Sequence, residues 1–191
     1  MNLQAIKIEQ ARHQIESNSG LSMPFAGAVY WTVLGILGYF LTPFNWAMAA
    51  AFSSGMIFPL GLALQKPFKS PFMKATSPLA AAGLRATLGI NLLWPVHIAI
   101  MLNAIELLPL SLGIGMSLHW LVIGWTYDSR ACTLHVVMRT VAVTAIWFLF
   151  PALNYTILPF VIAGIYLLTV VMLRAEVKAK IANQLVSSPV T

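Results

Sequence analysis

Residues 84–127 read LRATLGINLLWPVHIAIMLNAIELLPLSLGIGMSLHWLVIGWTY, and this stretch decides the fold. A helix needs roughly 20 apolar residues to cross a bilayer, so the stretch is long enough to cross it twice. Polar side chains at membrane depth are costly and usually have a function or a specific partner. The polar residues inside this stretch are Arg85, Asn91, His97, Asn103, Glu106 and His119. The sequence therefore predicts two adjacent membrane-spanning helices whose polar residues require an explanation.

The composition of the whole chain also indicates a membrane protein. The chain has 191 residues, of which 59% are hydrophobic and 8% are charged, whereas soluble domains contain about 25% charged residues. A soluble fold of this size could not cover so much apolar surface, but in lipid that surface needs no cover. The net charge of +6 comes from short basic clusters between apolar runs. This pattern is typical of membrane topology and not of a nucleic-acid-binding surface, so the expected partner is the lipid bilayer.

The apolar runs predict an all-α fold, namely a bundle of six transmembrane helices arranged as three hairpins. Turns that contain proline or asparagine separate most of the runs. The predicted spans are 24–41, 46–64, 79–102, 107–126, 131–150 and 155–173. We expect three parts in the chain: an N-terminal segment with a short interfacial helix at 1–23, the membrane domain at 24–173, and a tail at 174–191.

Two local patterns refine the second and third spans. Ala47, Ala51 and Gly55 recur at four-residue spacing, which predicts a face where another helix approaches closely. Pro59 and Pro95 lie inside the predicted spans, and proline in a helix interior predicts a kink.

The distribution of charge predicts the orientation. An even number of spans places both termini on one side, and all eleven lysines and arginines fall on that side. The three opposite turns contain a single charged residue, Glu106. By the positive-inside rule, both termini are expected in the cytoplasm. Glu9 and Glu16 interrupt the N-terminal segment, so a cleaved signal peptide is not expected.

Four short phrases in spans 2 to 4 resemble a family of small bacterial multi-span membrane proteins of unknown function. They are SGMIFP at 54–59, LWP at 93–95, ELLP at 106–109, and the run from His119 through Gly124 and Trp125 to Tyr127. The resemblance implies a bacterial inner-membrane protein and implies no particular activity.

Several enzyme and metal-binding classes lack support in the sequence. The single cysteine, Cys132, can form neither an internal disulfide nor a multi-cysteine metal site. The chain contains no GxxxxGK[ST], HExxH or GxSxG motif. His97 and His119 would lie about 9 and 18 Å from the outer turn, too far apart in depth to share a haem or metal. We therefore expect no cofactor and no metal site.

The polar residues of spans 3 to 5 are candidates for a substrate pathway. Asp128, His135 and Arg139 are spaced by seven and four, so they share one face of span 5. Arg85 and Arg139 would either snorkel to the interface or form the cytoplasmic mouth of the pathway. The residues predicted to line it are Arg85, Asn91, His97, Glu106, His119, Asp128, His135 and Arg139.

Most tryptophans and tyrosines lie near predicted span ends, as expected for an aromatic belt that anchors the protein at the interface. Trp31, Trp120 and Tyr166 do not fit this belt. Their role is left open by the sequence.

Three function classes remain. The first is a small carrier or channel for a small solute or ion, with its polar interior between spans 3, 4 and 5. The second is a non-catalytic membrane subunit or assembly factor that packs against another subunit or a second copy. The third is a membrane-embedded enzyme acting on a lipid-linked substrate, with His119 or His135 as the base.

Overall fold

The computed structural model describes residues 2–187, and every regular element in that range is helical. The elements are α1 (Leu3–Glu16), η1 (Asn18–Gly20), α2 (Ser22–Leu37), α3 (Pro43–Ser54), α4 (Ile57–Ala63), α5 (Gln65–Phe68), η2 (Phe72–Lys74), α6 (Ala80–Asn91), α7 (Trp94–Asn103), η3 (Ile105–Leu107), α8 (Leu108–Gly115), α9 (His119–Tyr127), α10 (Arg130–Leu149), η4 (Pro151–Leu153) and α11 (Ile157–Ser187). The all-α prediction is therefore confirmed. Residues 188–191 of the predicted tail lie outside the described residues.

Several of the helices are long and apolar enough to cross a membrane. Five stretches meet this condition within the described residues, and they are Asn18–Leu37, Ala80–Asn103, Ile105–Tyr127, Arg130–Leu149 and Ile157–Asn183. The pair α3 and α4 meets it jointly but is bent by 46°. The chain thus has the helices of a multi-pass membrane protein.

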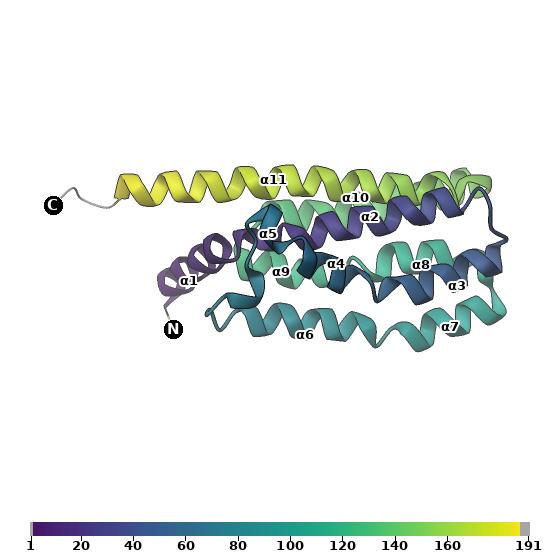
Figure 1. Ribbon diagram of the computed structural model, residues 1–191, viewed down its shortest axis with the longest axis horizontal. Helices are drawn as coiled ribbons and strands as arrows, with labels where there is room; N and C mark the ends of the chain where they lie inside the picture. The colour runs from purple at the N-terminus through teal and green to yellow at the C-terminus, as the bar shows by residue number, and fades with distance from the viewer. Residues whose placement is uncertain (1, 188–191) are drawn as a thin grey trace.

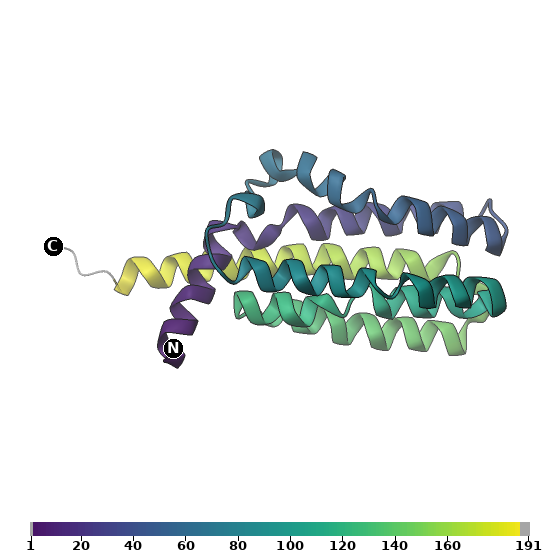
Figure 2. The same cartoon turned by 90° about the horizontal axis from the view of Figure 1, so that it is seen from below.

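The helices form an elongated bundle in which α2, α10 and α11 run along the long axis (Figure 1). Helix α2 packs between α11 and the α3–α4 pair, and α10 packs between α11 and the α8–α9 pair. The α6–α7 stretch lies at the edge of the bundle and packs on α8 and α9 (Figure 2). Helix α1 and the C-terminal part of α11 project from the same end.

Three of the apolar stretches are interrupted near their middle. Pro59 and Pro95 have no backbone N–H, so the carbonyls of Gly55 and Asn91 lose their usual helical donors at the α3–α4 and α6–α7 breaks. These two breaks agree with the predicted kinks. The third break, at 116–118 between α8 and α9, contains no proline and was not predicted.

The predicted small-residue contact of the second span is wrong at Gly55, although Ala47 of the same predicted face is buried. A side chain added at Gly55 would meet no atom within 4 Å, because Gly55 sits at the bend after α3. The face that meets α2 contains Trp46, Ala47 and Ala50, which are fully or almost fully buried. Trp46 Nε1 donates to the Leu34 carbonyl at 2.9 Å.

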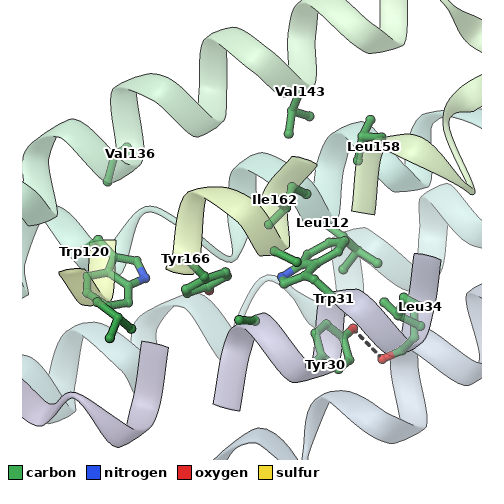
Figure 3. Close-up of a cluster of buried hydrophobic side chains, with 14 of the residues drawn as sticks. Tyr30, Trp31, Leu34, Leu112, Trp120, Val136, Val143, Leu158, Ile162 and Tyr166 are labelled. Atoms are coloured by element: carbon green, nitrogen blue, oxygen red, sulfur yellow. Dashed lines mark hydrogen bonds between the residues drawn. The ribbon is translucent and has the colours of Figure 1, made fainter. Parts of the chain in front are cut away.

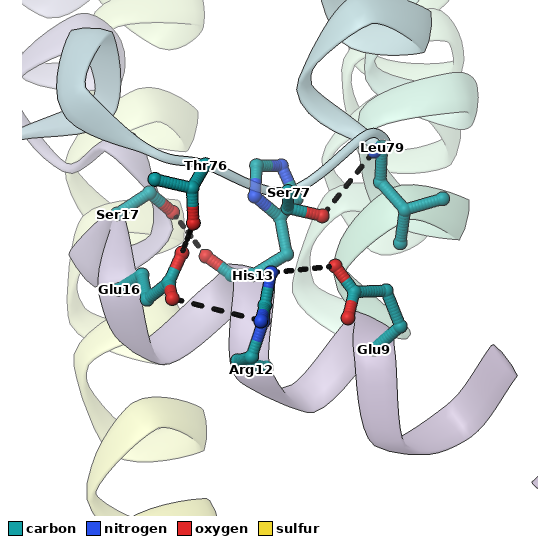
Figure 4. Close-up of polar contacts among 8 residues, drawn as sticks. All are labelled: Glu9, Arg12, His13, Glu16, Ser17, Thr76, Ser77 and Leu79. Carbon is teal, nitrogen blue, oxygen red and sulfur yellow. Dashed lines mark hydrogen bonds and ion pairs between the residues drawn. The ribbon is translucent and has the colours of Figure 1, made fainter. Parts of the chain in front are cut away.

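Helix α1, which was predicted as a short interfacial helix, docks on the bundle through polar side chains. Gln10, His13 and Gln14 are buried, whereas Leu3 is 80% exposed. Gln10 Nε2 donates to the Trp125 carbonyl at 2.5 Å. Figure 4 shows the end of α1 against the 76–79 segment, where the Thr76 hydroxyl bonds a Glu16 carboxylate oxygen at 3.5 Å.

Candidate functional site

The most unusual polar residue of the bundle is Arg139, which is fully buried with 0% of its surface exposed. It lies nine residues after Arg130 in the 20-residue helix α10, or about 14 Å along a helix of roughly 30 Å. This is the middle of the apolar stretch. The expectation that Arg139 snorkels to the interface or stands at a cytoplasmic mouth is therefore corrected: its side chain points into the bundle.

Arg139 is held by neutral groups from three other helices. Its Nε donates to the Gly113 carbonyl at 2.6 Å, and its Nη1 donates to the Tyr166 hydroxyl at 3.0 Å. The guanidinium carbon lies 5.0 Å from the ring centre of Trp31 and 5.3 Å from that of Tyr166. Such contacts stabilise a cation through the negative faces of the rings.

No carboxylate neutralises this guanidinium among the described side chains. The ion pairs there join Lys7 to Asp128, and Arg12 to Glu9 and Glu16. Removing a charge from water costs several kcal/mol unless the charge is paired, and hydrogen bonds to neutral groups offset only part of this desolvation cost. Arg139 is thus an unneutralised positive charge at the centre of the bundle.

The break between α8 and α9 supplies one of the partners of Arg139. In a continuous helix the Ser117 N–H would bond the Gly113 carbonyl. Here the Ser117 N–H bonds the Ile114 carbonyl instead, at 2.9 Å. The Gly113 carbonyl is left without that helical donor and accepts from Arg139. The interruption of the helix therefore frees the Gly113 carbonyl that Arg139 uses as its acceptor.

His135 lies one turn before Arg139 and is also 0% exposed. Its Nδ1 lies 2.8 Å from Thr169 Oγ1, and Thr169 Oγ1 donates its own hydrogen to the Ile165 carbonyl at 2.7 Å. A hydroxyl has a single hydrogen to donate, so Nδ1 of His135 must be the donor to Thr169. The other ring nitrogen, Nε2, is therefore an unprotonated acceptor when the ring is neutral.

Several polar atoms around Arg139 and His135 have no hydrogen-bond partner. Figure 3 shows Tyr166 between Trp31 and Trp120, with each indole nitrogen on the side that faces Tyr166. The ring of His135 lies 4.8 Å from that of Trp120 and 4.6 Å from that of Tyr166, so these side chains are contiguous. The buried atoms without a partner in this region are Arg139 Nη2, Trp31 Nε1, Trp120 Nε1, His135 Nε2 and His119 Nδ1.

We call this group the arginine centre; it comprises Trp31, His119, Trp120, His135, Arg139, Tyr166 and Thr169. Buried polar groups in native proteins are nearly always hydrogen-bonded to protein or to a bound species. Three of the five unpartnered atoms are N–H donors, namely Arg139 Nη2, Trp31 Nε1 and Trp120 Nε1. The first of these belongs to a charged group. Acceptor atoms or negative charge are the chemistry that would satisfy these donors.

The other predicted site residues lie elsewhere. His97 is buried between α7 and α8, where its Nδ1 lies 2.8 Å from Ser111 Oγ. Its ring carbon Cε1 would lie 3.1 Å from a side chain added at Gly115, which explains the glycine there. An open groove of about 390 Å³ runs beside this pair, lined by His97, Ser111 and apolar residues of α7 and α8. This site does not join the arginine centre.

Arg85 and Asn91 point away from the bundle. Both are exposed on the outer face of α6. Asn91 Nδ2 donates to the Thr87 carbonyl of its own helix at 2.8 Å. The expectation that these two residues line the interior is corrected by their exposure.

Glu106 and Asp128 also lie outside the centre. The Glu106 side chain is exposed in η3, and only its backbone carbonyl is used, as acceptor from Trp147 Nε1 at 2.8 Å. Asp128 ends α9 with a φ of 48° and pairs with Lys7 at 2.6 Å. Asp128 was predicted to share a face of span 5 with His135 and Arg139, and this is wrong because α10 begins only at Arg130.

Two other residues start α10. The Ser129 side chain accepts from the Cys132 N–H at 3.4 Å. Glu176 of α11 accepts from the Ala131 N–H at 2.9 Å and from the Ser129 hydroxyl at 2.5 Å. A carboxylate at a helix N-terminus is stabilised by the helix dipole, so Glu176 fixes the end of α10 from the neighbouring helix.

The geometry leaves little support for the enzyme hypothesis. A base acting on a lipid-linked substrate must reach the membrane interface, but His135 is fully buried and His119 begins α9 next to the mid-span break. Within the described residues, no three His, Cys, Asp or Glu side chains are grouped so that they could hold a metal ion.

A protein family described as "Family of unknown function (DUF7010)" matches residues 6–176. Neither the curated proteins nor the solved structures contain a match to the chain.

Proposed function

This chain belongs to the DUF7010 family of unknown function, and we propose that it is a multi-pass bacterial inner-membrane carrier for a small anion. The proposed binding residue is Arg139, with the indole N–H groups of Trp31 and Trp120 completing the site. The observation that carries the proposal is a fully buried guanidinium whose Nη2 has no partner.

The electrostatics favour an anion over a cation or a neutral solute. A cation entering the arginine centre would meet Arg139 with no neighbouring carboxylate to offset the repulsion. A small anion would neutralise the guanidinium and accept hydrogen bonds from Arg139 Nη2 and the two indole N–H groups. Charge-assisted hydrogen bonds of this kind are stronger than neutral ones. The anion therefore stabilises groups that are otherwise costly to bury.

The proposal specifies a carrier with alternating access and not a continuously open channel. Arg139, His135 and Trp31 are each 0% exposed, so this conformation encloses the site. Interrupted helices at the midplane are typical of binding sites in secondary transporters. The α8–α9 break contacts Arg139 through Gly113, and we propose that this break is the element that moves when the site opens.

The proposed topology has six crossings, with the bent α3–α4 pair as the second. The basic residues of α1, the 65–74 loop and the end of α11 lie at one end of the bundle (Figure 1). The positive-inside rule then places that end and both termini in the cytoplasm.

The test is anion uptake into vesicles containing the purified protein, with chloride, nitrate and acetate as probes. Arg139→Gln and Arg139→Lys should each lower uptake. A hydrogen bond to a charged group contributes about 1.5–3 kcal/mol, which corresponds to a loss of roughly ten- to hundredfold in affinity. The matched control is Arg130→Gln, which removes an exposed arginine from the start of the same helix. Equal uptake by Arg139→Gln and the unaltered protein would refute the proposal.

A further inference from the structure

The α6–α7 stretch is the least buried of the apolar helices. Of the residues in its most apolar part, 6% are buried, compared with 28% to 61% in the four other long stretches. Its outer face is a continuous stripe at helical spacing, formed by Ala81, Leu84, Arg85, Leu88, Asn91, Leu92, Pro95, Ala99 and Leu102, all exposed. Apolar residues on this stripe can face lipid at no cost, so they do not by themselves indicate a partner.

Asn91 is the residue on this stripe that lipid cannot satisfy. It lies about 17 Å along the helix from Ala80 and about 18 Å from Asn103, which is the middle of the stretch. Its Nδ2 makes one bond, to the Thr87 carbonyl. The amide oxygen and the second N–H make no bond among the described residues. Polar groups at this depth usually face a protein partner and hydrogen-bond across helices.

We propose that the outer stripe of α6 and α7 is the interface with a second copy of this chain. All copies insert with the same orientation, so a twofold axis lies along the membrane normal and brings identical residues to equal depth. Asn91 then meets the Asn91 of the second copy. An amide has both a donor and an acceptor, so two such side chains satisfy each other without any other polar partner.

The remaining residues of the stripe suit this arrangement. Leu88 and Leu92 flank Asn91 and are 58% and 79% exposed, so they would pack around the amide pair. Arg85 lies six residues nearer the cytoplasmic end, where a long side chain can extend to the interface and keep its charge away from its copy. The proposal does not depend on anion transport, because Asn91 does not contact the arginine centre.

The first experiment is cross-linking in vesicles of phosphatidylethanolamine and phosphatidylglycerol. Asn91→Cys should form a disulfide-linked dimer on mild oxidation, because the two thiols would face each other across the axis. Val171→Cys is the matched control, as it is 65% exposed near the middle of α11. The unaltered protein, whose single cysteine Cys132 is buried, gives the background level of cross-linking. Equal cross-linking at positions 91 and 171, or none at 91, would overturn the proposal.

A second experiment measures the dimer fraction by energy transfer between labelled copies as the lipid is diluted. Asn91→Leu should weaken the dimer by roughly three- to thirtyfold, the range for interhelical hydrogen bonds in membranes. Asn91→Gln keeps the amide and should retain most of the association. The proposal fails if Asn91→Leu associates as strongly as the unaltered protein. It also fails if Asn91→Cys is captured in native membranes only by a different protein.

Discussion

Arg139 Nε donates to the Gly113 carbonyl at 2.6 Å, across the gap between α10 and the interrupted end of α8. The arginine uses a carbonyl that a continuous helix would have occupied with its own N–H. Because the Ser117 N–H bonds Ile114 instead, the helix break and the buried cation support each other.

The His135–Thr169 contact should be necessary for the stability of the arginine centre. Thr169→Val keeps the shape of the side chain but removes the oxygen that accepts from His135 Nδ1. Leaving a buried donor without a partner costs about 1–3 kcal/mol, so the melting temperature in detergent should fall. Thr169→Ser retains the hydroxyl and should keep most of the stability. If Thr169→Val and Thr169→Ser are equally stable, the assigned tautomer and contact are wrong.

The close approach of α2 to α11 should depend on Gly27. A side chain at this position would lie 2.8 Å from the Tyr166 ring, so Gly27→Ala should displace Tyr166 and weaken its bond to Arg139. Overpacking of this kind typically costs about 1–3 kcal/mol. The control is Gly164→Ala on α11, where an added side chain would meet no atom within 4 Å. Thermal unfolding of the two variants in detergent should separate them, and the account of this contact is contradicted if Gly27→Ala is the more stable one.

The docking of α1 should weaken in acid. Burial lowers the pKa of His13 below its ordinary value near 6.5; Glu16 and Glu9 oppose this shift, and Arg12 adds to it. In undocked α1, His13 regains its ordinary pKa. Between the lowered pKa of the docked state and this ordinary pKa, undocked α1 therefore binds more protons than docked α1. The contribution of neutral His13 to docking is therefore fully present above about pH 6.5. It is lost as the pH falls from that value toward the lowered pKa of the docked state.

Hydrogen exchange of the α1 amides measures this effect. Protection should decrease from pH 7 to pH 5 after correction for the intrinsic rate. His13→Gln removes the titrating group, so the protection of its α1 should not change over this range. A protection that is independent of pH in the unaltered protein would show that His13 does not control docking.

Much of the helical fold could be predicted from the sequence, because the length of an apolar run is a local property. The helix breaks at Pro59 and Pro95 were also predictable, since proline removes a donor at a known position. The α8–α9 break was not, because it depends on the carbonyl of Gly113 finding a donor in Arg139, 26 residues away. Such a contact between distant segments leaves no local pattern.

The candidate site was only partly predictable. Arg139 and His135 were recognised as polar residues in an apolar run, but the direction of a side chain depends on packing, so Asn91 was placed on the wrong side. For Arg85, exposure fits the snorkelling alternative and not a place in the interior. Trp31, Trp120 and Tyr166 gave a usable signal, because they were the aromatic residues that did not fit the interfacial belt. The structure brings all three to Arg139 or His135.

The most direct test of the central claim is quenching of tryptophan fluorescence by iodide, at constant ionic strength, in detergent. Trp31 lies 5.0 Å from the Arg139 guanidinium, so an anion bound there should quench it at low concentration. We expect a saturable component of quenching in the unaltered protein. In Arg139→Gln, only the linear, collisional component of exposed residues such as Trp125 should remain. A linear dependence in both proteins, or the same saturable component in both, would contradict the assignment of Arg139 as an anion site.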